Sequence, residues 1–397
     1  MMVAGNYLND PEKVNLLAHS ALSNYEWTVN EFGVEYVENS ICQEGGHTVP
    51  RDVTVKNGSG SGIVLCELKK CKELGVPVRM RSKVEEIIRT EKGVEGVRVR
   101  ESYRFPNEKS GKVKTIRATK GVVLCYGGFS ADLNFRKRQD PKLNEKIDTT
   151  NQPGATAELW RETMAIGCLH VQDDWIQCGP WACPREKGMG IAWRFNQNAA
   201  AEWGLWVTNE GKRFVNELAD RKVRADAIMV QLNSGKKCYA ICNHVNLKAL
   251  NDQRPTAMAT MLERKVVEKF ASLKDLCASA GINYENVKKE VDAFNEVVKT
   301  KNDTVWGRYI NATQQPLTEE GPWYYGELMP KVHHCMGGLV TDIDCRVIDV
   351  RTDKPIPGLF AAGEATSGVH GACRLGSLGM LDCLVFGRIA GQKVMGA

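Results

Sequence analysis

The sequence of 397 residues predicts an α/β protein whose first domain is interrupted by an inserted one. Residues 122–126 form a short continuous apolar run, which is typical of a strand covered on both faces of a sheet. From about residue 179 the pattern changes to periodic helical stretches joined by polar connectors, and near residue 330 it changes back. We therefore expect three segments: 1–178 and 331–397, which form one α/β domain, and 179–330, an inserted α+β capping domain.

Each element follows from its periodicity and its stop signals. Helices that end at Gly75 and Gly167 are the clearest, and the turn Glu91-Lys92-Gly93 joins two strands into a hairpin. The expected helices are 62–74, 156–166, 261–270, 287–298 and about 377–394. The expected strands are 76–80, 84–89, 94–99, 122–126 and 358–363.

The composition is that of a soluble globular chain, with 43% apolar and 25% charged residues. The formal charge of +5 is spread without a basic stripe, so we expect no nucleic-acid partner. No apolar run approaches the roughly 18 residues of a membrane span. The first residues lack the charged and apolar regions of a signal peptide, so a cytoplasmic location is expected, unless a lost N-terminus carried an export signal.

The 14 cysteines include no C-x-x-C pair. Their spacing therefore predicts neither a metal site nor a disulfide framework, and we expect mostly reduced, buried thiols. Because C-x-x-C-H is absent too, any haem that exchanges electrons with this protein must lie on another chain.

The most informative motifs lie in the last fifth of the chain. Residues 333–338 read His-His-Cys-Met-Gly-Gly, residues 358–364 read Gly-Leu-Phe-Ala-Ala-Gly-Glu, and residues 368–376 read Gly-Val-His-Gly-Ala-Cys-Arg-Leu-Gly. Two adjacent histidines in an extended segment point to opposite sides. Arg374, in the glycine-rich loop, can hold a carboxylate with two hydrogen bonds. A pair of structural histidines is the alternative interpretation.

Together these motifs resemble the flavin-binding segment of the fumarate reductase/succinate dehydrogenase flavoprotein superfamily, in its soluble branch of fumarate and urocanate reductases. The resemblance covers nearly the whole chain and implies an FAD-binding, Rossmann-like domain of the two-dinucleotide-binding type. That family opens with a G-x-G-x-x-G turn that binds the FAD pyrophosphate, and this sequence has none. We therefore expect a chain that lacks the first βαβ unit and holds FAD weakly by itself. An inactive or split fragment stays open.

The resemblance implies contacts to FAD at two strand ends and along the C-terminal loop and helix. Glu364 can accept hydrogen bonds from two ribityl hydroxyls, and a helix that starts near Ser377 would point its amides and positive dipole end at the flavin. For the Gly-Gly pair after residue 126, a tight turn is the alternative. The implied cofactor-binding residues are Gly127, Gly128, Ala155, Thr156, His334, Gly363, Glu364, His370, Ser377 and Leu378.

The resemblance also implies catalytic residues. Residues 209–217 match a signature of the family's capping domain, and Arg221 follows where the family keeps the arginine that protonates substrate. Because arginine has a pKa above about 12, it can donate a proton only beside a forming carbanion in a dry site. A salt-bridging arginine is the alternative. The resemblance assigns His333 and Arg374 to the substrate carboxylate.

Three positions depart from the family. Gly179 stands where fumarate reductases carry a histidine for the second carboxylate, and Gln197 and Ala200 replace a Glu and an Arg that feed protons to the catalytic arginine. The implied function is reduction of the C=C bond of an unsaturated monocarboxylate of the acrylate, cinnamate or urocanate type. Hydride would come from FAD N5, and electrons from a cytochrome or reduced flavin on another chain.

A ketosteroid-type flavin dehydrogenase is the alternative enzyme. Such enzymes use tyrosines in place of the two arginines, so the retention of Arg221 and Arg374 favours the reductase.

Overall fold

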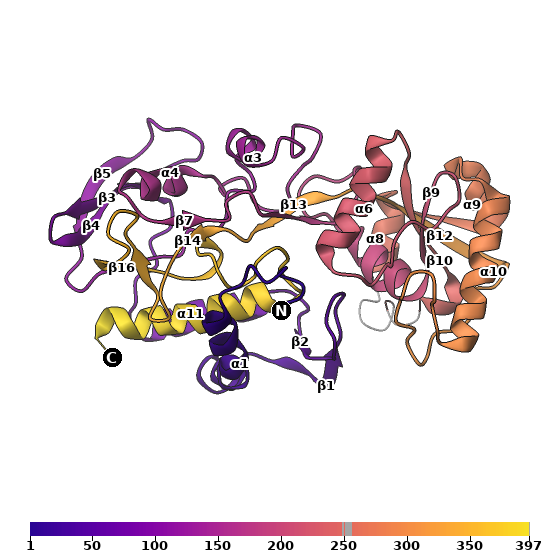
Figure 1. Ribbon diagram of the computed structural model, residues 1–397, viewed down its shortest axis with the longest axis horizontal. Coiled ribbons are helices and arrows are strands. Elements are labelled where there is room, and N and C mark those ends of the chain that lie inside the picture. Colours follow the sequence, from indigo (N-terminus) through magenta and orange to yellow (C-terminus); the bar gives the residue numbers. More distant parts are fainter. Residues whose placement is uncertain (248–249, 251–255, 397) are drawn as a thin grey trace. The chain divides into compact units, whose positions relative to one another are not determined.

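The computed structural model describes residues 1–247, 250 and 256–396 of the chain, which forms two compact units (Figure 1). The first unit comprises residues 1–144, 153–176 and 334–397. The second comprises residues 145–152 and 177–333. The predicted boundaries lay at 178/179 and 330/331, and residues 145–152 had not been assigned to the inserted part. Helices and strands mix in both units, and the predicted α/β class is confirmed.

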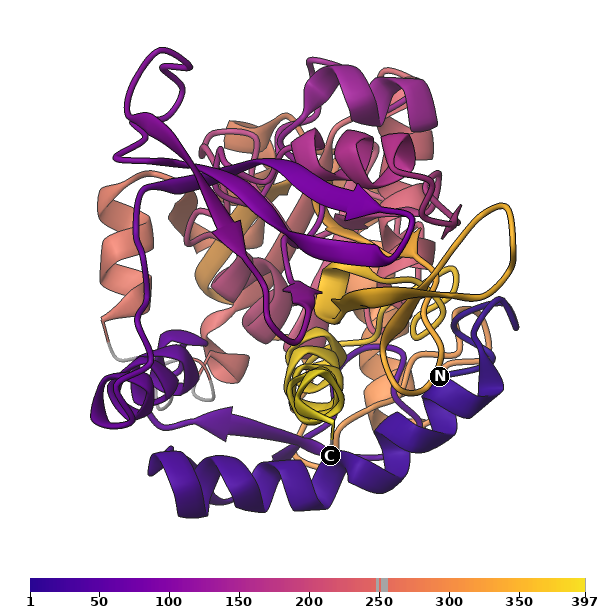
Figure 2. The ribbon, with the colours of Figure 1, turned by 90° about the vertical axis from the view of Figure 1, so that its left-hand side faces the viewer.

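In its described residues, the first unit holds two three-stranded and two two-stranded sheets, with α11 and α1 packed beside each other (Figure 2). The sheets have the orders β1-β2, β3-β4-β5 and β15-β16-β6, and β14 pairs with β7. The elements are α1 (Pro11–Phe32), β1 (Tyr36–Cys42), β2 (Asp52–Val55), α2 (Ser61–Glu73), β3 (Ser82–Thr90), β4 (Gly93–Glu101), β5 (Lys112–Arg117), β6 (Val122–Leu124), α3 (Leu133–Gln139), α4 (Glu158–Ala165), β7 (His170–Val171), β14 (Gly338–Leu339), β15 (Arg346–Ile348), β16 (Pro355–Ala361), the 3-10 turn η3 (Gly363–Ala365) and α11 (Leu378–Met395).

One pairing in this unit positions much of the candidate site. Strands β6 and β16 are parallel, with Leu359 opposite Val122 and Ala361 opposite Leu124. Their carboxyl ends therefore meet at one edge of the sheet. The loops that follow these strands, which begin near Gly127 and Gly363, start side by side.

The second unit is built on an antiparallel sheet of order β11-β12-β10-β9, and β8 forms a separate pair with β13. Both β8 and β13 contain a boundary between the units, after Ile176 and after His333. The elements are β8 (Ile176–Gly179), α5 (Trp193–Phe195), the π-helical turn η1 (Asn196–Ala201), β9 (Leu205–Thr208), α6 (Arg221–Asn233), β10 (Cys238–Asn243), η2 (His244–Asn246), α8 (Ala257–Glu263), β11 (Val267–Ser272), α9 (Leu273–Ala280), α10 (Tyr284–Thr300), β12 (Glu320–Leu328) and β13 (Lys331–Cys335).

Both faces of the four-stranded sheet are buried, as the central strand β10 illustrates. Cys238, Ala240 and Cys242 face one apolar cluster, which includes residues of α6 and α8. Tyr239 and Ile241 face the other cluster, which α9 and α10 cover. Because successive side chains of a strand alternate between faces, helices on both sides bury all six residues of β10.

A buried carboxylate, Glu217, lies at the centre of a charge cluster in the second unit. Arg213 donates to both of its oxygens, at 3.0 and 2.8 Å, and Arg308 donates to one at 3.2 Å. Asp303 accepts a further bond from Arg213 at 3.1 Å. Two positive and two negative side chains, none more than 8% exposed, thus balance one another. Buried charges are tolerated when they are paired in this way.

Most of the predicted elements are present, and two differ in the structure. The helices α2, α4, α10 and α11, the β3–β4 hairpin and strand β16 are confirmed. A strand at 76–80 is wrong, because Val76, Val78 and Met80 are each more than half exposed and belong to no strand. The helix at 261–270 is wrong in its second half, because Lys265 adopts a left-handed φ of 54° and residues 267–272 form β11.

Within the described residues, no helix is both long and apolar enough to cross a lipid bilayer. In the same part of the chain, no cluster of three or more His, Cys, Asp or Glu side chains has the arrangement of a metal site.

The charge cluster yields a stability prediction. Glu217→Gln leaves Arg213 and Arg308 with too little negative charge, so we expect unfolding of the second unit to require about 3–5 kcal/mol less. Urea denaturation monitored by tryptophan fluorescence measures the change. The matched control is Glu296→Gln, whose ion pair with Lys299 has both side chains more than 60% exposed. It should cost less than about 1 kcal/mol. Equal effects of the two substitutions would contradict a central role for Glu217.

Candidate active site

In the first unit, two glycines follow strand β6 and lie against the loop after β16. Gly127 has φ +76°, and a Cβ at this position would have no described atom within 4 Å. A Cβ on Gly128 would instead overlap Glu364 Oε1 and lie 3.0 Å from the Cys335 sulfur. Gly128 is therefore required by close packing on Glu364, whereas Gly127 exposes backbone to open space, as close approach of a ligand demands.

Glu364 and His334 form the polar centre of this unit. Glu364 Oε1 accepts a hydrogen bond of 2.9 Å from the Cys335 amide, and its Oε2 lies 3.4 Å from His334 Nδ1. Burial lowers the pKa of His334, and the nearby Arg374 and His370 act in the same direction, against the opposing effect of Glu364. His334 is therefore neutral at pH 7. Its Nδ1 would donate to Glu364, which leaves Nε2 as an acceptor.

His370 stands beside His334 with the two ring centroids 5.4 Å apart and the planes at 76°. Its Nε2 lies 3.3 Å from Oδ2 of Asp382, and both side chains are at most 4% exposed. Asp382 was not predicted, although it lies on the expected C-terminal helix. An acidic residue one turn inside an otherwise apolar helix start is the signal that could have found it.

Arg374 lies against the first turn of α11. Its side chain donates to the Leu375 carbonyl at 3.0 Å, and a Cβ on Gly379 would lie 3.0 Å from its Cδ. Because residue 379 is a glycine, the aliphatic part of the Arg374 side chain has room to pack against the helix. Ser377 precedes α11 with φ +58° and makes no side-chain cap to the helix. The first-turn amides of this 18-residue helix, which begins at Leu378, thus carry no side-chain cap.

These residues fit part of a flavin. Gly127 leaves open space beside its Cα, Glu364 offers a buried carboxylate, and α11 offers a positive helix end. Among the described residues, no hydrogen-bond partner is present for Nε2 of His334, which is buried. Ala155 and Thr156 lie farther along, where the Ala155 carbonyl accepts from the Ala131 amide at 2.9 Å. Their predicted contact with the cofactor stays a prediction.

In the second unit, His333 is fixed from two sides. Its Nδ1 lies 2.7 Å from the Thr150 hydroxyl, and its carbonyl accepts from Asn151 at 3.3 Å. The ring meets that of Trp181 edge-on, with centroids 5.7 Å apart. Thr150 was not predicted, because its segment, 145–152, is far from His333 in sequence and joins this unit only in the folded chain.

Trp181 also contacts Arg221, the predicted proton donor. The Arg221 guanidinium carbon lies 4.7 Å from the Trp181 ring centroid, within the range of a cation–π interaction. Arg221 is 7% exposed and is the first residue of α6, directly after the N-cap Asp220, whose side chain accepts from the Val223 amide. The predicted residues Arg221 and His333 thus contact the same indole.

Gly179 borders this arrangement. A Cβ on it would lie 3.6 Å from Trp181 Cζ2 and 3.7 Å from the His333 Cβ and Cγ, which is ordinary van der Waals contact. Arg224, one turn after Arg221, donates to Gln197 at 2.6 Å and to the Glu217 carbonyl at 3.1 Å. Arg224 was not singled out from the sequence. Gln197, one of the three positions that depart from the family, therefore accepts a hydrogen bond from a second arginine, Arg224.

The adjacent histidines divide between the units. His334, Glu364, His370, Arg374, Ser377 and the glycines belong to the first unit, and Arg221 and His333 belong to the second. The expectation that His333 and His334 serve different surroundings agrees with their separate partners, Trp181 for one and Glu364 for the other.

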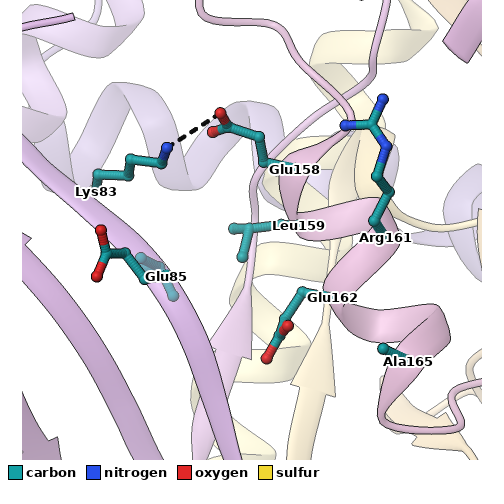
Figure 3. Close-up of a pocket in the computed structure, with 8 residues that line it drawn as sticks. Lys83, Glu85, Glu158, Leu159, Arg161, Glu162 and Ala165 are labelled. Carbon is teal, nitrogen blue, oxygen red and sulfur yellow. Dashed lines mark hydrogen bonds and ion pairs between the residues drawn. The ribbon is translucent and has the colours of Figure 1, made fainter. Parts of the chain in front are cut away.

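A separate groove of about 450 Å³ in the first unit lies between β3 and α4 (Figure 3). Lys83 donates to Glu158 at 3.1 Å across it, and Arg161 pairs with Asp132 at 2.7 Å instead. No predicted site residue lines the groove, and each of its charged side chains already has a hydrogen-bond or ion-pair partner. We assign it no function.

The chain has clear relatives. A family model described as an FAD binding domain matches residues 1–380. The acrylate reductase flavoprotein subunit of Shewanella woodyi is 35% identical over 100% of this chain and 78% of the relative. The urocanate reductase of Eggerthella lenta is 31% identical over 99% of this chain, which spans 63% of that protein. The open conformation of a flavocytochrome c3 fumarate reductase matches with a TM-score of 0.72 and 27% identity, over 99% of this chain and 65% of its own.

The pair formed by His334 and Glu364 yields a titration prediction. Glu364→Gln removes the negative charge that raises the pKa of His334, so this pKa should fall further below its ordinary value of 6.5. Nuclear magnetic resonance of ¹³C-labelled histidine follows the titration without any flavin, with His334→Gln to assign the signal. His19→Gln, an exposed histidine on α1, is the control and should leave the His334 signal unchanged. A rise of the His334 pKa in Glu364→Gln would contradict this account.

Proposed function

We propose that this chain, which belongs to the FAD-binding domain family, reduces the C=C bond of a small α,β-unsaturated monocarboxylate. The observation that carries the proposal is the grouping of Arg221, Trp181 and His333 in the second unit. The similarity to an acrylate reductase subunit and a urocanate reductase supports it, since both named substrates are unsaturated monocarboxylates.

FAD is the cofactor of the family, and when bound it supplies a hydride to the substrate. The residues of this chain that would hold it are those of the first unit. Glu364 would accept hydrogen bonds from hydroxyl groups, the neutral His334 would offer Nε2 as an acceptor, and the start of α11 would stabilise negative charge.

Arg221 is proposed as the proton donor. Its guanidinium is buried and lies on an indole face, where few water molecules can compete for the proton. It begins α6, so the positive end of that helix dipole favours negative charge at the same place. A carbanion that forms there is stabilised until the proton is transferred.

His333 and Trp181 would define the size of the substrate. Trp181 is 5% exposed and occupies the space between Arg221 and His333, so it limits what can lie beside them. Gly179 adds no polar side chain to this surface. A second carboxylate placed against Gly179 and Trp181 would be desolvated without a partner, which costs several kcal/mol. A small monocarboxylate has no second carboxylate, so its binding does not include this desolvation cost.

Arg194 is the cation that could replace the missing histidine. Its guanidinium carbon lies 4.6 Å from the Trp193 ring, so it stacks on its own neighbour. This contact favours the monocarboxylate over a dicarboxylate. The retention of both arginines, Arg221 and Arg374, favours a reductase over a ketosteroid-type dehydrogenase.

Replacement of the proton donor tests the assignment of Arg221. We expect Arg221→Lys to lower kcat by about 10²–10⁴-fold, because positioned general acids contribute that much, while FAD affinity stays unchanged. The assay uses acrylate, added FAD and a reduced viologen as the electron source. Arg264→Lys, an exposed arginine after α8, is the control and should keep the full rate. Near-normal turnover by Arg221→Lys would remove the assignment.

A substrate panel tests the monocarboxylate. We expect acrylate, and then cinnamate or urocanate, to exceed fumarate in kcat/KM, because only fumarate brings a second carboxylate to the surface of Gly179 and Trp181. Gly179→His, for which the Cβ has room, should raise the fumarate-to-acrylate ratio of kcat/KM by at least tenfold. Fumarate exceeding every monocarboxylate in the unmodified chain would overturn the substrate class.

A further inference from the structure

The loop between β1 and β2 is a closed structure with two buried polar side chains. It is closed at its base, where Cys42 pairs with Asp52 and the Arg51 amide donates to the Cys42 carbonyl at 3.0 Å. Gln43 donates across the loop to the His47 carbonyl at 2.7 Å. None of these residues was singled out from the sequence.

His47 reaches from this loop to the segment before α11. Its Nε2 lies 3.2 Å from the carbonyl oxygen of Gly376 in a buried hydrogen bond, and its side chain is 0% exposed. The loop also packs directly on Gly376, because a Cβ there would overlap the Glu44 carboxylate. Any other residue at position 376 would therefore require the Glu44 side chain to move.

Asp52 holds the next residue, Ser377. The Asp52 carboxylate, which is 7% exposed, lies beside the Ser377 side chain and accepts a hydrogen bond from the Glu44 amide at 3.4 Å. Ser377 has φ +58°, a left-handed backbone conformation that residues other than glycine adopt only at a cost in free energy. A serine before a helix usually caps the helix with its hydroxyl, but Ser377 makes no such cap to α11 and lies beside Asp52 instead.

We propose that His47 and Asp52 are positioning residues for the start of α11. Together they fix Gly376 and Ser377, so that Ser377 keeps its left-handed conformation and its carbonyl accepts from the amides of the first turn of α11. Arg374, which lies against Gly379 in the same turn, is fixed with them. The consequence for a flavin at this helix end rests on the proposed function; the positioning itself does not.

Hydrogen exchange of the unliganded chain tests the positioning. The amides of Met380 and Leu381 donate to the Ser377 carbonyl at 3.1 and 3.4 Å, so their protection reports its conformation. Asp52→Ala and His47→Ala should each speed exchange of the segment containing these amides by at least tenfold. Asp52→Asn, whose amide oxygen can still accept from Ser377, should stay within about threefold of the unmodified chain. His19→Gln is the control.

A rescue separates positioning from a general loss of stability. Glycine adopts a positive φ without cost. Adding Ser377→Gly to Asp52→Ala should therefore restore protection to within about threefold, because the conformation no longer needs Asp52. Unchanged exchange in Asp52→Ala, or no rescue by Ser377→Gly, would overturn the proposal. Exchange that rises equally in α10 would also overturn it, since that indicates global unfolding.

The link to the cofactor has its own readout. A helix end favours negative charge, so loss of its position should weaken binding of reduced FAD more than oxidised FAD. We expect the ratio of the two dissociation constants to change by about tenfold in Asp52→Ala and not in Asp52→Asn. Faster exchange with an unchanged ratio would overturn this link alone. Failure of the unmodified chain to bind reduced FAD at all would instead count against the proposed function.

Discussion

The buried carboxylate of Glu217 is the point on which the second unit depends. Besides its bonds to Arg213 and Arg308, one oxygen accepts from the Trp206 amide at 3.2 Å, which ties it to strand β9. Its backbone carbonyl accepts from Arg224, whose guanidinium also lies 5.8 Å from the Trp181 ring. Arg221 contacts the same ring. A single anion therefore organises the sheet, the helix that begins at Arg221 and the indole between them. Networks of this kind fix one arrangement only when every member is paired.

The fold class and most long elements could be predicted, because their apolar patterns are regular. Helix α1 could not, although Asp10 caps it and Pro11 occupies its first position. Its buried residues are Lys13, Leu17, Asn24 and Thr28, so three of the four are polar and the apolar stripe is missing. The buried Lys13 donates hydrogen bonds to the Thr341 hydroxyl and the Ser367 carbonyl, both 3.0 Å long. These partners are distant in sequence, so no local pattern predicts them.

The candidate site divides in the same way. Within the motifs of the last fifth of the chain, His334 contacts both Glu364 and His370, because one parallel strand pair and one helix start bring these segments together. Trp181, Arg221 and His333 come from three separate segments, and their common contact is a property of the folded unit. Asp382, Thr150 and Asp52 act on site residues from a distance in sequence. Sequence motifs identify groups that carry chemistry more readily than those that hold them in place.

The order in which the strands β6 and β16 leave the ribosome has a consequence for folding in the cell. The residues of β6 appear early, whereas their parallel partner in β16 follows only after the whole second unit has been made. During that interval the second unit can fold, while β6 keeps an unpaired edge beside apolar residues such as Leu124. Long-range parallel pairing is slow, and such edges invite association with other chains. The nascent chain is therefore expected to depend on chaperones until residues 334–397 emerge, and the second unit should be the first part to resist proteolysis.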